Sequence, residues 1–582
     1  MLKQAMTCDY ENDALLLAKT AKIVRKKIDS YKSFQFDGEF HSGCQQGSVP
    51  PNLKTLVSML LNGADLTDQD SCESQASLTV SQTILFNFTN RGSSPKSRHS
   101  LNREPPLPLY IGMKIHTETR SKKLIKQLYE LGLSVSYDRV LQNQSQIATA
   151  VCEDFKDKGA VVPAQLRRGL FTVAAIDNLD HNPSSTTAQG SFHGTGISLF
   201  QFPTSYNCGE KQNDIRLPLA DTKKNHQLPD IFTNVPAVAL KTAKVSVPHI
   251  EYVSTPKEWH LFDAQLKEKR WLEHARQQLL KDEDEKGDIV AWSAFHASMQ
   301  DESADQHTSL TQLLPLFYEK AATAAMIKHG MNVLRLATEY LNPGQVPVIT
   351  FDAPLYALAK FIQWNWPDTH GEEKFIPMFG GLHIEMAMWK TYGDYLEGSG
   401  WTNALTEAGI ASSGTSDSFL KASHLTRTRH AHQVTALVLA KLQEDAFLIT
   451  EGEHSDEAKE AWRQQMVQKS PTFHYWDTVL DMELLGLIFI RAHREGNFKL
   501  YVESLKELVP WFFALNHHNY ARWIPIHITD MESLPAPIRK EFKEHSHWVI
   551  TKNTNRFRPC QLIKHTSKIM KLSRIPGRSQ TG

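Results

Sequence analysis

Several common functional signatures are missing from this sequence, and each absence removes a class of protein. The 582 residues include only six cysteines and no Cys-x-x-Cys pair, so a zinc ribbon or zinc finger is not expected. There is no Walker A motif, no Gly-x-Ser-x-Gly and no Gly-x-Gly-x-x-Gly. Nucleotide triphosphatase, α/β-hydrolase and dinucleotide-binding functions therefore have no support.

Long apolar runs and an excess of one charge are also missing. No apolar run is long enough to span a membrane, and the N-terminus lacks the hydrophobic core of a signal peptide. Lys+Arg and Asp+Glu both number 64, so the overall charge predicts neither nucleic-acid nor membrane binding. Sparse cysteine is typical of a reducing compartment. We therefore expect a soluble, intracellular protein that does not contact a membrane.

One local basic segment stands out against this balance. From Asn555 to Gly582, the tail over 546–582 carries seven Lys or Arg residues and no acid. We expect it to be disordered and solvated. A phosphate-binding arm or a nuclear address is the functional alternative, and on this basis the nucleus is the expected location.

The hydrophobic pattern divides the chain into regions. Residues 1–165 show mostly helical spacing, with a flexible polar linker near 90–108. From residue 166, short β-capable segments appear among helices. "GLFTVAAIDNLD" and "SFHGTGISLFQFP" predict a hairpin, "VPVITFD" and "KFIPMFGG" predict further strands, and 313–341 predicts a long helix. We expect an α-rich α/β fold with its core over 166–545 and large helical insertions.

Two of the predicted strands end in aspartate. Asp177 continues the alternating face of the first strand, and Asp352 ends "VPVITFD". Carboxylates at the C-terminal ends of neighbouring strands lie where α/β sheets bind ligands and metals. A close carboxylate pair favours a hard divalent cation such as Mg²⁺ or Mn²⁺. Asp352 is equally a good helix N-cap, and Asp180 is expected to serve only a turn.

A third metal ligand is harder to choose. Glu483 lies in a strongly apolar predicted helix, where a buried acid needs a partner, so it is the candidate. Asp481 and Glu495 compete with it, and a salt bridge to Arg491 or Arg494 is the structural alternative.

Other constellations predict different chemistry. His383-x-Glu385 has the form of part of a non-haem iron triad, which would need a distal histidine. The candidates for that histidine are His424, His430, His432 and His474. Arg427 and Arg429 precede an apolar helix and Arg522 lies among aromatic residues, so these arginines, with His383, are candidate nucleic-acid contacts. The alternative for Arg427 and Arg429 is a solvated basic turn, and the alternative for Arg522 is packing in the core.

Five segments together resemble a known group of proteins: "AIDNLDHNPSS…SFHGTGISLFQ", "VITFDAPLYALAKFIQW", "FGGLHIEMAMW", "ASHLTRTRHAHQ" and "NHHNYARWIPIHI". They look like a large family of uncharacterised proteins from genomes rich in mobile elements, and the likeness runs from about residue 35 to about 540. A more distant likeness is to a fungal family of unknown function. Such proteins are regarded as transposon-derived, with a ribonuclease-H-like core.

The resemblance implies a transposase-type site. The ribonuclease-H-like order places acids on the first strand, the fourth strand and a later helix, which assigns Asp177, Asp352 and a later glutamate, with Glu483 chosen. The family varies at the position of Glu385 and has an acid where this chain has Asn516 or His517. The leading hypothesis is a metal-dependent nuclease or strand-transferase that acts on DNA. A domesticated or decayed, inactive nucleic-acid-binding or scaffold protein is the alternative, and a non-haem metal oxygenase is the third.

Overall fold

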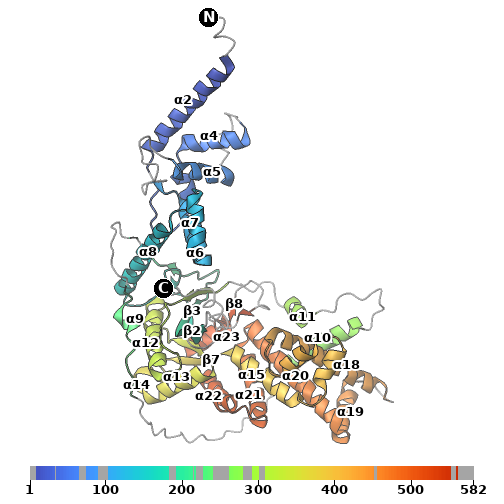
Figure 1. The fold of residues 1–582 in the computed structure, drawn as a ribbon. Coiled ribbons are helices and arrows are strands. Elements are labelled where there is room, and N and C mark those ends of the chain that lie inside the picture. The colour runs from blue at the N-terminus through green and yellow to red at the C-terminus, as the bar shows by residue number, and fades with distance from the viewer. Residues whose placement is uncertain are drawn as a thin grey trace. The chain divides into compact units, whose positions relative to one another are not determined.

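The protein folds into two compact units. The computed structural model describes residues 8–32, 34–63, 74–88, 103–181, 192–213, 215, 217, 227–239, 261–279, 291–299, 308–450, 455–551 and 559–560. One unit contains residues 1–157 and 214–229, and the other contains 158–213 and 230–582 (Figure 1). Most of the predicted linker (89–102) and the end of the predicted basic tail (561–582) lie outside the described residues.

The first unit is helical in its described part. Its helices are α2 Cys8–Ser30, α3 Cys44–Ser48, α4 Pro51–Asn62, α5 Gln75–Phe86, α6 Pro106–Thr119, α7 Lys122–Glu130 and α8 Tyr137–Lys158. Apolar side chains at helical spacing form a core between α2, α4 and α5, where Val24 and Ile28 pack with Leu53, Val57 and Leu85. The helical prediction for this region is correct.

The second unit is a mixed α/β structure in which helices dominate. Its strands are β1 Arg167–Arg168, β2 Thr172–His181, β3 Phe192–Gln201, β4 Glu210–Lys211, β5 Leu310–Leu313, β6 Val348–Phe351, β7 Ile376–Phe379, β8 Ile550–Thr551 and β9 Pro559–Cys560. Its first helices are α9 Asp230–Thr233, α10 Phe262–Leu279, α11 Trp292–Ser298, α12 Ala324–Leu341, α13 Ala353–Asn365, α14 Pro367–His370 and α15 Gly381–Leu396. The later helices are α16 Trp401–Glu407, α17 Ser413–Leu420, α18 Leu425–Leu448, α19 Asp456–Lys469, α20 Pro471–Glu495, α21 Phe498–Ala514, α22 His518–Glu532 and α23 Ala536–Glu544.

A five-stranded sheet in the order β5-β3-β2-β6-β7 organises this unit. β2, β3 and β5 are antiparallel neighbours, whereas β6 runs parallel to β2, and β7 parallel to β6. The predicted hairpin is confirmed as β2 and β3. The prediction of a turn at Asp180 was wrong for the backbone, because β2 continues through His181 and Asp180 pairs with His193.

The faces of the sheet are covered by different helices. Ile176 of β2 lies under Gly330 of α12, where an added Cβ would approach Ile176 Cδ1 to 2.9 Å. Phe171 packs edge-on against Phe542 of α23. Side chains along a strand alternate between the two faces of the sheet. Ile176 and Phe171 therefore lie on opposite faces, and Asp177 lies on the same face as Phe171.

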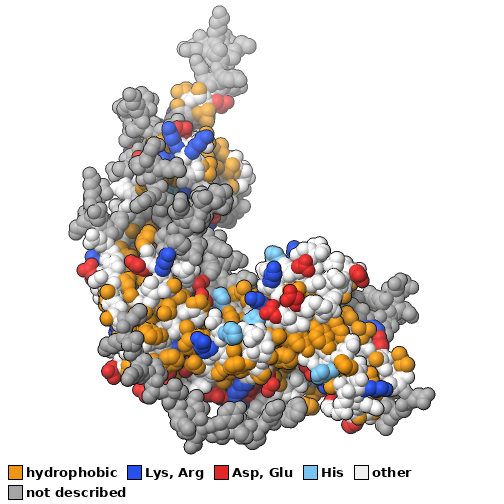
Figure 2. All heavy atoms as spheres, turned by 60° about the horizontal axis from the view of Figure 1, so that its bottom comes forward, with side chains coloured by type: hydrophobic (Ala, Val, Ile, Leu, Met, Phe, Trp, Pro, Cys, Tyr) orange, Lys and Arg blue, Asp and Glu red, His pale blue; other side chains and the backbone are white. Residues whose placement is uncertain are grey.

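A long helical segment separates β7 from the helix that returns to it. After β7 the chain passes through α15 to α21, and α22 then packs against α13 and β7 (Figure 1). Apolar side chains gather on the surface of this helical part, as the orange band at the right of Figure 2 shows. Within the described segments, none of the helices combines the length and apolarity needed to cross a bilayer.

Candidate metal site at the ends of the central strands

The sheet makes the strand of Asp177 the neighbour of the strand that Asp352 follows. β2 and β6 are parallel neighbours, in which Ala174 pairs with Ile349 and Ala175 with Thr350. Two more residues along each chain place Asp177 level with Asp352. Asp352 directly follows the last residue of β6, whereas Asp177 lies in the middle of β2, which runs on to His181, so the predicted position at a strand end holds for Asp352 alone.

Asp177 is a buried residue that lies opposite a glycine of β3. The residue is buried, with 8% of its surface exposed. Its cross-strand partner on β3 is Gly196, and Leu179 likewise pairs with Gly194. Glycines in a strand permit close approach of a ligand or another chain. The residues of β3 that pair with Asp177 and Leu179 thus have no side chains.

Asp352 has a structural task as well. Its Oδ1 atom accepts a hydrogen bond from the Leu355 backbone N–H at 2.9 Å, and the residue is the N-cap of α13. The N-cap alternative is therefore correct for one oxygen. A carboxylate has two oxygens with several acceptor sites, so this cap does not by itself prevent Asp352 from binding a cation.

Two further side chains lie within electrostatic range of Asp352. Burial lowers the pKa of His383, and the negative charge of Asp352 opposes that shift. Burial also raises the pKa of Tyr520 to about 12, and Asp352 adds to that shift. His383 belongs to the first turn of α15, and Tyr520 to the first turn of α22. Sequence reasoning did not identify Tyr520 as part of this site, because only the fold brings α22 to it.

The structure does not bring Glu483 to the two aspartates. Glu483 Oε1 and Oε2 lie 2.8 and 2.9 Å from His432 Nδ1, and both residues are almost completely buried. The start of α15 packs closely against His493 of α20. A Cβ atom added to Gly381 would lie only 2.3 Å from His493 Nε2. Glu483 precedes His493 by ten residues on α20, which corresponds to about 15 Å along the helix. Sequence reasoning missed His432 as its partner.

The alternatives for the third acid also have other partners. Asp481 forms an ion pair with Arg463 at 2.8 Å. Arg491 pairs with Glu268 of α10 at 2.8 Å and lies 3.7 Å from Glu495. The expected alternative, a salt bridge from Glu483 to Arg491 or Arg494, is replaced by the contact to His432.

The proposed iron triad does not assemble. Both carboxylate oxygens of Glu385 are bonded to Arg429, with Arg429 Nη2 donating to Oε2 at 2.6 Å and Nε donating to Oε1. Trp389 Nε1 also donates to Oε1 at 3.1 Å. These contacts occupy a carboxylate that has no exposed surface, so Glu385 is held by Arg429 and Trp389 within the protein.

The predicted nucleic-acid contacts have different surroundings. Arg427 and Arg522 are exposed, and His383 is partly buried beside Asp352. Arg429 differs from them because its guanidinium is held by Glu385. Of the four predicted contacts, Arg427 and Arg522 are thus the two with an exposed cationic side chain.

The position at which the resemblance led us to expect an acid precedes α22. Asn516 is exposed and has φ of 59°, and His517 Nε2 lies 2.9 Å from Asp394 Oδ2. Throughout the described residues, no group of three or more His, Cys, Asp or Glu side chains is arranged to hold a metal ion. Asp177 and Asp352 are therefore two candidate ligands, and no third acid converges on them in this part of the chain.

Comparison with known proteins adds one match. A family described as a domain of unknown function (DUF8702) matches residues 291–465 and 453–563. These segments cover α11 through α23 and include Asp352 but not Asp177. No curated protein and no solved structure matches the chain.

Proposed function

We propose that this chain is a transposon-derived protein whose sheet binds a divalent cation through Asp177 and Asp352 and uses it to cleave or join DNA phosphodiesters. The observation that carries the proposal is the register of the parallel strands β2 and β6, whose last pair, Ala175 with Thr350, comes two residues before Asp177 and Asp352. A cation between them would neutralise both carboxylates and offer open coordination positions to a DNA phosphate.

The strand order supports a ribonuclease-H-like core. Three antiparallel strands come first in the chain, the fourth pairs in parallel with the first, and the fifth pairs with the fourth. In this arrangement the acids of the first and fourth strands are neighbours. The resemblance seen in the sequence implies the same order, and the transposon origin and a nuclear location depend on that resemblance.

Asp177 and Asp352 would supply two of the oxygen ligands that Mg²⁺ or Mn²⁺ requires. Both donors are carboxylates, which hard cations prefer, and Mg²⁺ is commonly held by one or two carboxylates with water and substrate phosphates completing its shell. The glycines of β3 beside Asp177 would allow a phosphate to approach. When bound, the cation would activate a water and stabilise the leaving oxygen. This chain would supply Asp177 and Asp352 to hold it.

The direct test uses supercoiled plasmid with Mg²⁺ or Mn²⁺. The wild-type chain should nick the plasmid, and Asp352→Asn should abolish nicking while keeping the N-cap, because asparagine caps helices as well as aspartate. Asp417→Asn, at an exposed position on α17, is the matched control. Nicking that persists undiminished in Asp352→Asn would reject the proposal.

A second candidate function is DNA binding without cleavage. The observation that favours it is that no third acid converges within the described residues, since Glu483 is bound to His432 and an asparagine stands at residue 516. In that case the two aspartates would hold a cation that bridges to DNA phosphate, and exposed Arg427 and Arg522 would add phosphate contacts.

Binding and cleavage can be separated in one experiment. Fluorescence anisotropy of a labelled duplex measures binding, and a gel of the same sample measures cleavage. Metal-dependent binding with intact DNA would favour the second candidate. Binding that neither requires the metal nor changes in Asp177→Asn would argue against the role of this site in both.

A further inference from the structure

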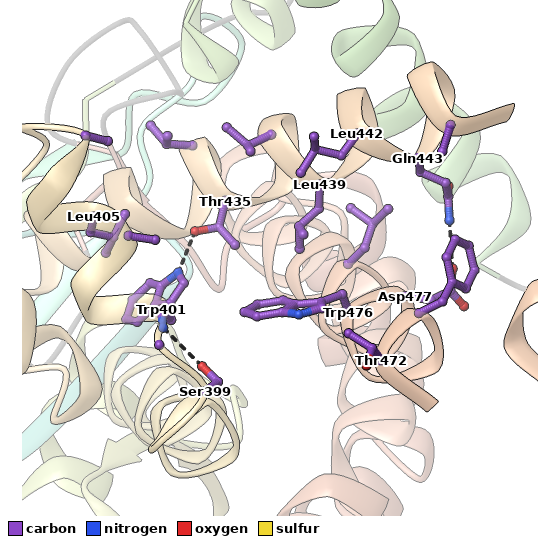
Figure 3. Close-up of a pocket in the computed structure, with 18 of the residues that line it drawn as sticks. Ser399, Trp401, Leu405, Thr435, Leu439, Leu442, Gln443, Thr472, Trp476 and Asp477 are labelled. Atoms are coloured by element: carbon purple, nitrogen blue, oxygen red, sulfur yellow. Dashed lines mark hydrogen bonds between the residues drawn. The ribbon is translucent and has the colours of Figure 1, made fainter. Parts of the chain in front are cut away.

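An apolar pocket lies in the helical part of the second unit, apart from the strand ends. It has a volume of about 800 Å³, and α16, α18, α19 and α20 contribute to its lining. Leu439 of α18 and Trp476 of α20 point toward one another across it, and Leu405 of α16 lies at one end (Figure 3). The proposed metal chemistry uses none of these residues.

The walls of the pocket remain partly open to solvent. Val438 and Leu442 of α18 line it with 48% and 59% of their surfaces exposed. Ala404 of α16 is also exposed and lines the pocket. Large apolar side chains that are left uncovered around a concave surface mark a binding site more often than isolated ones do.

Trp401 and Asp477, two polar side chains of the lining, already have partners. Trp401 Nε1 donates to Thr435 Oγ1 at 2.8 Å. Asp477, the one charged residue of the lining, accepts from Gln443 at 2.8 Å and from Arg463 Nε at 2.7 Å. A ligand would therefore find no unpaired charge to neutralise its own, and a buried charge without a partner is unfavourable.

We propose that this pocket binds a small neutral apolar molecule. Its volume falls within the range of ~300–1,000 Å³ typical of small-molecule sites, which are mainly lined by hydrophobic and aromatic side chains. Trp476 supplies an aromatic surface, and Leu405 and Leu439 supply aliphatic contacts. The ligand covers Val438 and Leu442, removing their exposed surface from water.

A fluorescent probe tests the proposal on the full chain. N-phenyl-1-naphthylamine is neutral and apolar, and it should bind saturably with energy transfer from tryptophan. Ala404→Trp fills the pocket and should weaken binding at least tenfold, whereas Asn403→Trp, on the same helix but outside the lining, should leave it unchanged. Circular dichroism confirms that both variants fold.

A second matched pair places a charge in the pocket wall. Leu442→Lys should weaken binding of the probe at least tenfold, and Leu448→Lys, exposed on the same helix outside the lining, should not. The absence of saturable binding, or equal losses in both members of a pair, would overturn the proposal. So would a dimer, seen by sedimentation, that Ala404→Trp dissociates, because a second copy of the chain would then occupy the pocket.

Discussion

His432 Nδ1 lies 2.8 Å from Glu483 Oε1 in a region that water does not reach. The imidazole stacks against Trp389 with ring centroids 4.2 Å apart and against Trp401 at 5.1 Å. Burial raises the pKa of Glu483, and the adjacent His432 opposes that shift. The acid that the sequence suggested as a metal ligand thus belongs to a buried contact between α18 and α20.

Removing Glu483 should damage stability. Glu483→Ala leaves His432 buried without its partner and should lower the free energy of unfolding by about 3–5 kcal/mol. Urea denaturation measures this change. Asp481→Ala on the same helix removes a partly exposed ion pair and should cost below about 1 kcal/mol. Similar losses in the two variants would contradict this account of Glu483.

The Glu385–Arg429 pair should behave as one unit. Arg429→Met leaves the Glu385 carboxylate buried and unpaired, so we expect a loss of about 3–5 kcal/mol in unfolding free energy. Glu385→Met should have a similar effect. The double variant should recover most of the loss, because apolar side chains often replace a buried ion pair without penalty. A double-mutant cycle in urea tests the coupling, and additive losses would show that the pair is not coupled.

Stability should fall in mild acid because of buried His493. Burial lowers its pKa from 6.5 to about 4, so the unfolded chain takes up a proton at a higher pH than the folded chain. The contribution of His493 is present above pH 6.5 and is lost as the pH falls toward 4. His493→Gln should reduce the slope of unfolding free energy between these values. His430→Gln, at an exposed position on α18, is the control, and an equal change there would refute the assignment.

Asn516→Asp tests whether the metal site lost an acid. Asn516 is exposed and has positive φ, which aspartate also tolerates, so the fold should be preserved. If α22 contributes to the site, this change should tighten Mn²⁺ binding several-fold and increase plasmid nicking. Asn519→Asp, exposed in the first turn of α22, is the matched control. Mn²⁺ affinity can be measured by electron paramagnetic resonance. Unchanged Mn²⁺ affinity would show that residue 516 does not contribute to the proposed metal site.

The strands could be predicted where apolar runs are short and bounded by turn residues. β2, β3, β6 and β7 all follow this pattern, and the pairing order makes β2, which carries Asp177, the neighbour of β6, which Asp352 follows. β5 was missed. The sequence predicted a helix over 313–341, but α12 begins at Ala324 behind the Thr323 cap. Leu310–Leu313 is a partly buried edge strand whose apolar residues fit either structure.

The partners of the buried acids could not be predicted. Glu483 meets His432, and Glu385 meets Arg429, only because α18 packs against α15 and α20. No sequence spacing encodes such contacts, and a single chain offers many histidines and arginines as candidates. The sequence did indicate that Glu483 is buried and needs a partner, which the structure confirms. The choice between a metal and a side chain required the packing of the helices.

The pairing of β2 with β6 also constrains how the protein is made. β2 and β3 are close in sequence and can form a hairpin as soon as both have left the ribosome, whereas β6 follows only after β5 and α12. Until then the β2 edge has unpaired backbone groups, and such edges promote association between chains. We therefore expect slow folding controlled by this non-local pairing, and a need for chaperones that shield the hairpin during synthesis.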